Sequence, residues 1–123
     1  MGAVHCIKAV LPGMKKNHYG RIINVASVAG VYGNRNMAHY SATKGTLIAI
    51  TKELAKEVAP QGISVNAVSP GSVSPSENDD VNSYISSPFS YSERTGTDAE
   101  NAELILLSCR RQMPVHKRTE YSN

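Results

Sequence analysis

Three side chains in the first part of the chain have the types and spacing needed to move a proton to or from an oxygen atom. Ser27, Tyr40 and Lys44 lie within the stretch SVAGVYGNRNMAHYSATK. A phenol has a pKa near 10, so it is a poor acid or base at neutral pH unless a neighbouring cation favours the phenolate. Lys44 follows Tyr40 by four residues, which places both side chains on one helix face, about 5–6 Å apart at Cβ. Ser27 can hydrogen-bond a carbonyl or alcohol oxygen while Tyr40 passes the proton. We call these three residues the trio.

The same Tyr-x-x-x-Lys spacing also occurs on ordinary solvated helix faces, so the spacing alone leaves both interpretations open. His39 is adjacent to Tyr40. We do not expect it to act as a base, because adjacent residues of a helix point away from each other.

The elements that must position the trio alternate between helix and strand. Apolar spacing predicts a helix over 3–14, in which Pro12 introduces a kink or a looser turn, and a longer helix over 39–60 that Pro60 and Gly62 end. Two short runs rich in β-branched residues, 21–27 and 63–69, predict strands buried on both faces. This order predicts an α/β fold with parallel strands joined by crossover helices. Ser27 then lies at the carboxyl end of a strand, where such sheets bind ligands.

The composition changes after this second strand. Residues 69–97 are rich in Ser, Pro, Asn and Asp, and we expect a long mobile loop that acts as a lid over a binding site. Asp98 is expected to cap a final short helix over 99–107.

Composition and charge exclude several classes of protein. Hydrophobic residues make up 41% and charged residues 19% of the 123, which is typical of a globular chain. No apolar run is long enough to span a bilayer and no secretory signal is visible, so we expect a cytoplasmic protein without a membrane partner. Cys6 and Cys109 are far apart and predict neither a disulfide nor a metal site.

The net charge of +3 arises entirely in the last 16 residues. Residues 1–107 hold nine Lys or Arg and nine Asp or Glu, whereas the tail holds four basic residues and one Glu. A basic tail can bind a phosphate backbone, but it has no interleaved aromatic residues or recognisable module. A nucleic-acid partner is therefore not expected.

Three motifs occur in a familiar order and spacing: GRIINVASVAG, YSATK and GISVNAVSPGSV. With them the chain resembles the short-chain dehydrogenase/reductase family, most closely the branch that contains the bacterial 3-oxoacyl-[acyl-carrier-protein] reductases. The resemblance extends to about Leu107, where ERTGTDAENAELI is similar to the late Arg-Gly-Thr segment of the family and its following helix.

The resemblance implies a role for each residue of the trio. Ser27 would position the substrate oxygen, Tyr40 would be the general acid and base, and Lys44 would lower the tyrosine pKa and hold the nicotinamide ribose of NADP or NAD. The stretch at the nicotinamide end of the cofactor would correspond to Pro70, Gly71 and Val73. Asn24 and Asn66 are expected to brace strands and loops rather than to react.

The chain also departs from the family pattern. Three features of the family would precede Met1. They are the glycine-rich phosphate loop, the residue that selects NAD or NADP, and a fourth catalytic residue, which is an Asn. We therefore expect the C-terminal portion of a doubly wound parallel-sheet (Rossmann-like) domain that lacks its first βαβ units, over residues 1–107. Pro75, flanked by Ser74 and Ser76, stands where the family usually has Thr, which puts a cofactor hydrogen bond in question.

Residues 108–123 are expected to be a non-native tail. At the position where the family has a strand of the form Tyr-Ile-Ser-Gly-Gln, this chain has VHKRTEYSN. A DNA sequence can be chosen that encodes VHKRTEYSN in one reading frame and that family strand when read from the second base. A frameshift between about Leu104 and Val115 is our hypothesis for the tail. Codons in the gene that are incompatible with that frame would exclude it.

Two functions follow as expectations. The first is an NAD(P)-dependent oxidoreductase that interconverts a ketone and a secondary alcohol, with a 3-oxoacyl thioester as a candidate substrate. The alternative is a non-catalytic family fragment that cannot hold cofactor and acts through association of the helices 3–17 and 38–59, the surface through which the family forms homo-oligomers. For the isolated chain we expect weak or absent dehydrogenase activity. Neither the substrate nor the choice of NAD or NADP can be read from the residues.

Overall fold

The computed structural model describes residues 2–74 and 95–110. These residues form helices and strands in the following order: α1 (Gly2–Asn17), β1 (Gly20–Val25), α2 (Val28–Tyr32), α3 (Ala38–Val58), the 3-10 turn η1 (Ala59–Gln61), β2 (Ile63–Val68), β3 (Val73–Ser74), β4 (Gly96–Thr97) and α4 (Asp98–Cys109).

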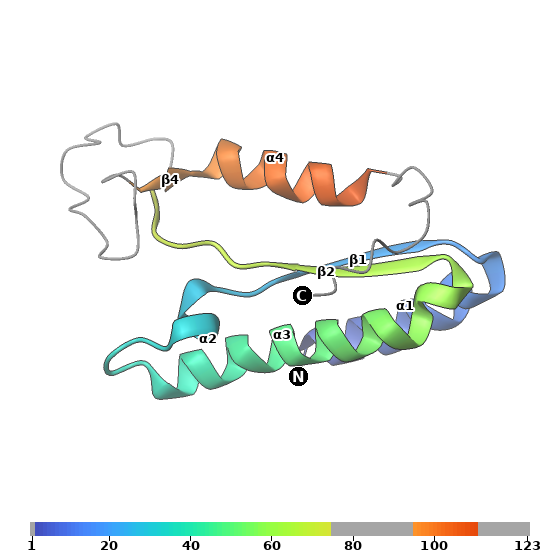
Figure 1. The fold of residues 1–123 in the computed structure, drawn as a ribbon, viewed down its shortest axis with the longest axis horizontal. Coiled ribbons are helices and arrows are strands. Elements are labelled where there is room, and N and C mark those ends of the chain that lie inside the picture. The colour runs from blue at the N-terminus through green and yellow to red at the C-terminus, as the bar shows by residue number, and fades with distance from the viewer. Residues whose placement is uncertain (1, 75–94, 111–123) are drawn as a thin grey trace, which may run out of the picture.

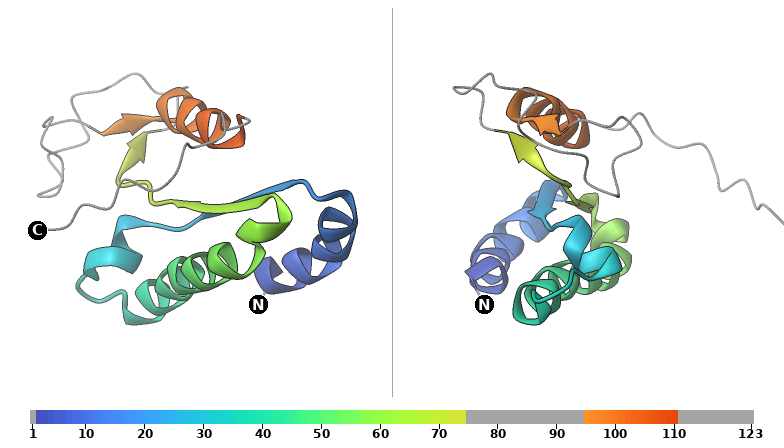
Figure 2. Two further views of the ribbon diagram at one scale, coloured as in Figure 1. Left: turned by 45° about the vertical axis from the view of Figure 1, so that its right-hand side comes forward. Right: turned by 90° about the vertical axis from the view of Figure 1, so that its left-hand side faces the viewer.

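Strands β1 and β2 pair in parallel, from Gly20 opposite Ile63 to Val25 opposite Val68. Helix α3 makes the crossover between them. Helices α1 and α3 lie side by side on one face of this pair, and α4 lies over the other face (Figures 1 and 2). The predicted α/β arrangement of parallel strands with a crossover helix is therefore confirmed.

The apolar core lies between the strand pair and the two long helices. Its buried members are Ile22, Val58, Ile63 and Val65, and half-buried side chains of α1 and α3 pack against them: Ile7, Leu11, Met14, Leu54 and Ala55. Val58 has no exposed surface. Burial of one such aliphatic side chain stabilises a fold by about 1.5–3 kcal/mol. The core thus attaches α3 to the strands along the last turns of the helix.

The prediction that both strands are buried on both faces is wrong. In β1, Gly20, Ile22 and Asn24 are buried, whereas Ile23 is half-buried and Val25 is 46% exposed. Side chains of a strand alternate between its two faces. The alternation arises because α1 and α3 cover one face closely, while α4 covers the other only in part.

The long helix ends where the sequence predicts. Helix α3 stops at Val58, Pro60 lies in η1, and Gly62 adopts a left-handed conformation with φ of 75°. A Cβ atom at residue 62 would collide with the carbonyl oxygen of His18, so only glycine fits there. This close approach sets the start of β2 beside the start of β1.

Three local features differ from the sequence expectations. The stretch after β1, for which the sequence predicted no element, contains the short helix α2. Helix α1 spans Gly2–Asn17, beyond the predicted end at residue 14, with Pro12 inside it. Thr97, not Asp98, caps α4: its hydroxyl accepts from the backbone of Glu100, and the Glu100 carboxylate accepts from the Thr97 N–H in return. A hydroxyl with a Glu three residues later is the reciprocal capping box, which outweighs the single carboxylate at Asp98.

The predicted lid, residues 69–97, is described only at its two ends. There β3 and β4 pair in parallel, with Val73 opposite Gly96, and the Gly96 N–H donates to the carbonyl of Ser72 at 2.9 Å. Pro75, Ser76 and most of the predicted basic tail, 111–123, lie outside the described residues, as does the side chain of Ser74.

Candidate active site

Ser27 lies just beyond the carboxyl end of β1, as predicted. It has an extended backbone and is the N-cap of α2, where its hydroxyl oxygen accepts a hydrogen bond from the Ala29 N–H at 3.2 Å. The side chain is half-buried. An N-cap serine satisfies one of the free N–H groups at a helix start, so α2 holds the Ser27 hydroxyl at a defined place beside the strand end.

Tyr40 and Lys44 lie on the first two turns of α3, also as predicted. The Lys44 ammonium lies 5.7 Å from the centroid of the Tyr40 ring. A cation at that distance over a phenol ring is attracted to it electrostatically. Both residues are half-buried. The structure therefore brings the cation and the phenol of the trio together.

The Lys44 side chain reaches from α3 to the end of β1. Its Nζ donates to the carbonyl oxygen of Val25 at 2.9 Å. The next residue, Ala26, donates its N–H to Val68 of β2. The Val25 carbonyl and the Ala26 N–H belong to one trans peptide group and point in opposite directions, so the Val25 carbonyl points away from β2. Lys44 is thus bonded to the outer edge of β1, two residues before Ser27.

Helices α2 and α3 touch through backbone at the same place. A Cβ atom built on Gly30 would lie 2.7 Å from the backbone N of Gly45 and 2.9 Å from the Cβ of Lys44. Side-chain carbon does not fit at such distances, so the two helices approach this closely only because residue 30 is glycine. This contact sets the distance between α2, which Ser27 begins, and the turn of α3 that carries Lys44.

The three residues expected at the nicotinamide end of the cofactor follow β2. The carbonyl of Pro70 accepts from the Val28 N–H at 3.1 Å, which joins this loop to the residue after Ser27. Gly71 and Val73 are exposed, and Val73 is part of β3. Of the three, Pro70 is therefore the one that the structure bonds directly to the α2 start.

The braces expected from the sequence are found in part. Asn24 is buried and donates to the Thr51 hydroxyl of α3 at 2.8 Å, so its bracing role is confirmed. Asn66 is half-buried in β2. His39 is exposed at the start of α3. The sequence reasoning missed Thr51 and Gly30; a glycine inside a helical pattern, such as Gly45, was the available signal for a close backbone contact.

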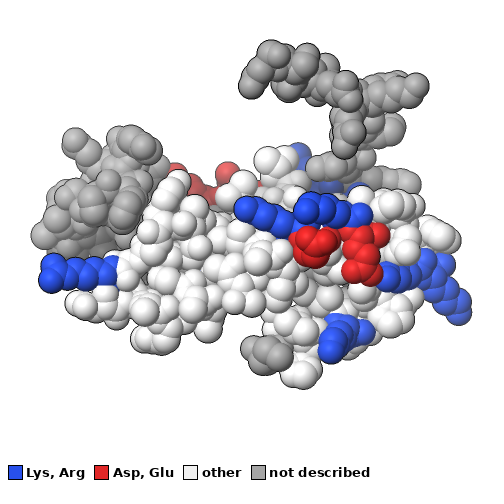
Figure 3. Space-filling view, turned by 60° about the horizontal axis from the view of Figure 1, so that its bottom comes forward, with Lys and Arg blue, Asp and Glu red and all other residues white. Residues whose placement is uncertain are grey.

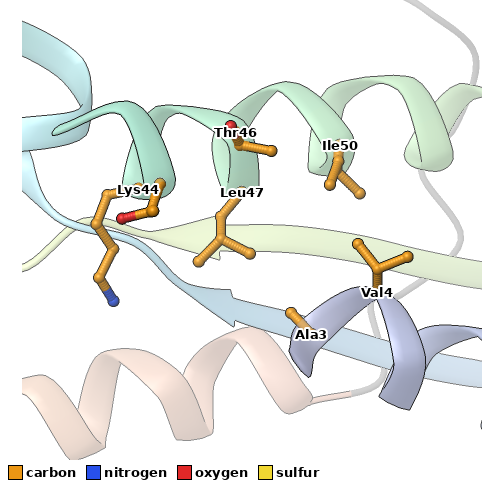
Figure 4. Close-up of a pocket in the computed structure, with 7 residues that line it drawn as sticks. Ala3, Val4, Lys44, Thr46, Leu47 and Ile50 are labelled. Atoms are coloured by element: carbon orange, nitrogen blue, oxygen red, sulfur yellow. The ribbon is translucent and has the colours of Figure 1, made fainter. Parts of the chain in front are cut away.

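A cavity of about 460 Å³ opens between α1 and α3, next to the trio. Figure 4 shows Ala3 and Val4 of α1 facing Leu47 and Ile50 of α3, with Lys44 at one end. Its lining residues are mostly apolar or small: Ala3, Val4, Thr43, Lys44, Thr46, Leu47 and Ile50. The lining favours an apolar occupant, and Lys44 is its one charged member.

Charges on the described surface are mixed in sign. Figure 3 shows Lys and Arg next to Asp and Glu on the face that it displays. Lys15 of α1 pairs with Glu57 of α3 at 3.2 Å, and Lys56 pairs with Glu53 at 3.6 Å. Within residues 2–74 and 95–110, no three His, Cys, Asp or Glu side chains are grouped so that they could hold a metal ion. None of the helices in these ranges is long and apolar enough to cross a membrane.

Comparison with known proteins gives a consistent match. The profile of the family described as short chain dehydrogenase matches residues 1–84. A 3-oxoacyl-[acyl-carrier-protein] reductase of Synechocystis sp. is 47% identical over 81 residues, which cover 66% of this chain and 33% of that protein. A 2-dehydro-3-deoxy-L-rhamnonate dehydrogenase (NAD(+)) of Sphingomonas sp. is 49% identical over 69 residues, 56% of this chain and 28% of that one.

Solved structures agree with the sequence match. A 3-oxoacyl-[acyl-carrier protein] reductase from Brucella melitensis, crystallised with bound NAD, superposes with a TM-score of 0.72 at 36% identity, over 85% of this chain and 39% of that one. The chain therefore spans about a third of the length of the curated relatives named above.

Proposed function

Since the chain belongs to the short-chain dehydrogenase family, a family of oxidoreductase enzymes, we propose that the trio moves the proton in an NADP- or NAD-dependent interconversion of a ketone and a secondary alcohol. One observation carries the proposal. Lys44 lies 5.7 Å from the Tyr40 ring and is bonded to the strand end that leads to Ser27. The phenol and its cation thus lie beside the carboxyl end of the parallel strand that leads to the Ser27 hydroxyl, and α/β sheets bind ligands at such strand ends.

The protein residues account for the oxygen side of the reaction. In the direction of reduction, the hydroxyl of Ser27 donates a hydrogen bond to the substrate carbonyl, and the Tyr40 O–H gives its proton to that oxygen. The carbonyl becomes an alcohol and Tyr40 becomes a phenolate, which the Lys44 ammonium stabilises by its charge. Oxidation of an alcohol reverses each step. The positioned hydroxyl also lowers the energy of the negative charge that develops on the oxygen.

The residues present fit the nicotinamide end of the cofactor. When bound, the nucleotide supplies or accepts the hydride at the carbon atom of the substrate. An ammonium has three N–H donors and Lys44 uses one for the Val25 carbonyl, so two remain for ribose hydroxyls. An added Cβ at Gly71 meets nothing within 4 Å, which leaves the backbone there open to a ligand. Pro70, Gly71 and Val73 are our candidates for this contact.

A 3-oxoacyl thioester is the substrate that we propose. Its 3-keto group is a ketone of the kind that the trio would reduce, and relatives that cover much of this chain are named as 3-oxoacyl-[acyl-carrier-protein] reductases. A relative of similar identity is named for a sugar acid instead.

We propose in addition that copies of the chain associate through α1 and α3. The support is the apolar cavity between these helices and the exposure of Val10, which is 45% exposed on α1. Light scattering at micromolar concentration measures the molar mass of the particles in solution. A molar mass equal to that of a single chain would contradict this association.

The enzymatic proposal is tested with Tyr40→Phe, which keeps the ring and removes the proton. Tyr19→Phe is the matched control, because Tyr19 is exposed and contacts Arg21 through its ring, which the variant keeps. We expect NADPH or NADH oxidation with an acetoacetyl thioester to fall about 100-fold or more in Tyr40→Phe. Activity in Tyr19→Phe should equal that of the parent.

Nucleotide binding is measured in the same samples by nicotinamide fluorescence. Micromolar binding that persists in Tyr40→Phe, together with lost turnover, would support the assigned role of Tyr40. Turnover in Tyr40→Phe equal to that of the parent would exclude Tyr40 as the proton donor. Binding and turnover that are both absent in the parent chain would contradict the enzymatic proposal for this chain and favour the non-catalytic alternative.

A further inference from the structure

A buried pair of polar side chains joins the middle of the fold to the helix that carries the trio. Asn24 of β1 donates to the Thr51 hydroxyl at 2.8 Å, and that hydroxyl donates to the Leu47 carbonyl at 2.8 Å. Asn24 is 7% exposed and Thr51 is 6% exposed. We call these two residues the Asn24–Thr51 pair. Buried polar groups at this depth are costly unless they are bonded, so the pair strongly prefers one relative placement of strand and helix.

Thr51 lies on the same face of α3 as the reactive residues. Positions 40, 44, 47 and 51 are separated by four, three and four residues, which is the spacing of one helix face. That face points to β1, because Lys44 and Thr51 both bond to it. Their two partners, Asn24 and Val25, are consecutive in the strand. Helix α3 is therefore attached to β1 by polar bonds immediately before the chain reaches Ser27.

The hydrogen bonds of the pair are directional, whereas the apolar contacts of α3 are not. Burial of apolar surface is non-directional, so by itself it specifies the place of a helix along a strand less sharply than a hydrogen bond does. A slide by one residue is about 1.5 Å along the helix axis. Such a slide would lengthen or misalign the 2.8 Å hydrogen bond, and the buried amide of Asn24 would be more weakly bonded. The same slide would change the positions of Tyr40 and Lys44 relative to Ser27.

We propose that Asn24 and Thr51 are positioning residues, which set the place of α3 along β1 and thereby hold Tyr40 and Lys44 in register with Ser27. The inference rests on the proposed function of the trio. Both side chains are buried and bonded to each other, so we assign neither a contact with substrate or cofactor. Reactive groups must be held within about 0.5 Å of their working geometry, and a shift of about 1 Å can cost 100-fold in rate.

The test uses Thr51→Val, which removes the hydroxyl at nearly constant shape, and Thr51→Ser as the matched control that keeps the hydroxyl. The first readout is the rate at which Lys44 is acylated by a water-soluble ester, followed by mass spectrometry in the full chain. Lys56 is the internal reference, since it lies on the same helix with an exposed side chain. We expect Lys44 to react at least about 3-fold faster in Thr51→Val, because its bond to Val25 is weakened, and at the parental rate in Thr51→Ser.

A second variant separates positioning from stability. In Asn24→Leu/Thr51→Val both polar partners become apolar, which commonly restores the stability that a single replacement loses. If the pair only stabilises the fold, Lys44 should regain its slow reaction in the double variant. If the pair positions α3, Lys44 stays reactive although the double variant is as stable as the parent. A parental Lys44 rate in both valine variants, or an equal increase in Thr51→Ser, would overturn the inference.

The labelling experiment does not depend on turnover, so it distinguishes failure of this inference from failure of the proposed function. In an active parent we also expect Thr51→Val to lower kcat about 10-fold, with the KM for the nucleotide within about 2-fold of the parent. Thr51→Ser should restore kcat. An inactive parent in which Thr51→Val still exposes Lys44 would contradict the proposed function and leave the placement of α3 by the pair supported.

Discussion

Different kinds of contact hold two regions of the molecule. The first region is the end that carries the trio, and the second runs from β3 to α4. Around the trio, tertiary contacts dominate: Gly30 touches the backbone of α3, Lys44 bonds to β1, and the Asn24–Thr51 pair is buried. In the second region, α4 has no buried residue, and Leu106 and Leu107 are 57% and 62% exposed. The side-chain hydrogen bonds of α4 join residues close in sequence: those of the capping box, Asn101 to the Thr97 carbonyl, and Ser108 to the Leu104 carbonyl.

This difference indicates in which region the described chain can hold atoms at a fixed distance from one another. A contact between segments far apart in the sequence fixes their relative position, whereas a cap fixes only the start of one helix. Ser27 lies before the α2–α3 turn, and Tyr40 and Lys44 lie after it. Contacts between segments far apart in the sequence therefore fix the relative positions of the trio. Gly71 precedes the second region and Val73 begins it, and both residues are exposed. We therefore expect substitutions in the first region to have the larger effects.

Ile63→Ala should have the largest effect. Ile63 is 2% exposed in β2, and truncation of such a side chain leaves a cavity that costs about 2–5 kcal/mol of the free energy of unfolding. Leu106→Ala, in α4, removes a similar amount of apolar carbon from an exposed site, with an expected change within about 0.5 kcal/mol. Urea unfolding followed by circular dichroism measures both. Equal losses would show that α4 is packed as closely as the core, and the comparison would fail.

Gly30→Ala is expected to cost about 1–3 kcal/mol, because its methyl group would force α2 away from the backbone of Gly45 and Lys44. The control is Gly13→Ala in α1, where an added Cβ meets nothing within 4 Å. That control should be neutral or stabilising by up to about 1 kcal/mol, since alanine favours helix. A stabilising Gly30→Ala would mean that the α2–α3 contact does not set the spacing of the trio.

Thr97→Ala should have the smallest effect and the most local one. Loss of the hydroxyl that caps α4 costs about 0.5–2 kcal/mol, and we expect faster amide hydrogen exchange in α4 with no change in α3. Thr46→Ala is the control, because Thr46 is exposed in α3 and its hydroxyl bonds to the Ala42 carbonyl of the same helix. Exchange that accelerates in α3 as well would indicate that α4 supports the trio, which the present contacts do not suggest.

Much of the fold was accessible from local pattern. Apolar periodicity predicted α1 and α3, two runs rich in β-branched residues predicted β1 and β2, and Pro60 with Gly62 predicted the end of α3. The short helix α2 was missed because Val28–Tyr32 is too short to show a period, and its start depends on the cap at Ser27. The two-residue strands β3 and β4 were missed for a similar reason, since their pairing joins segments on either side of the predicted lid.

The sequence by itself determined the chemical types of the trio, the spacing of Tyr40 and Lys44 on one helix face, and the parallel α/β class. These are properties of residue type and of the periods of helix and strand. Only the tertiary structure decided that Lys44 bonds to the outer edge of β1, that Gly30 rests on the backbone of α3, and that Thr51 meets Asn24. The physical reason is that these contacts join residues 15 to 27 positions apart, and their formation depends on how the crossover packs rather than on any local preference.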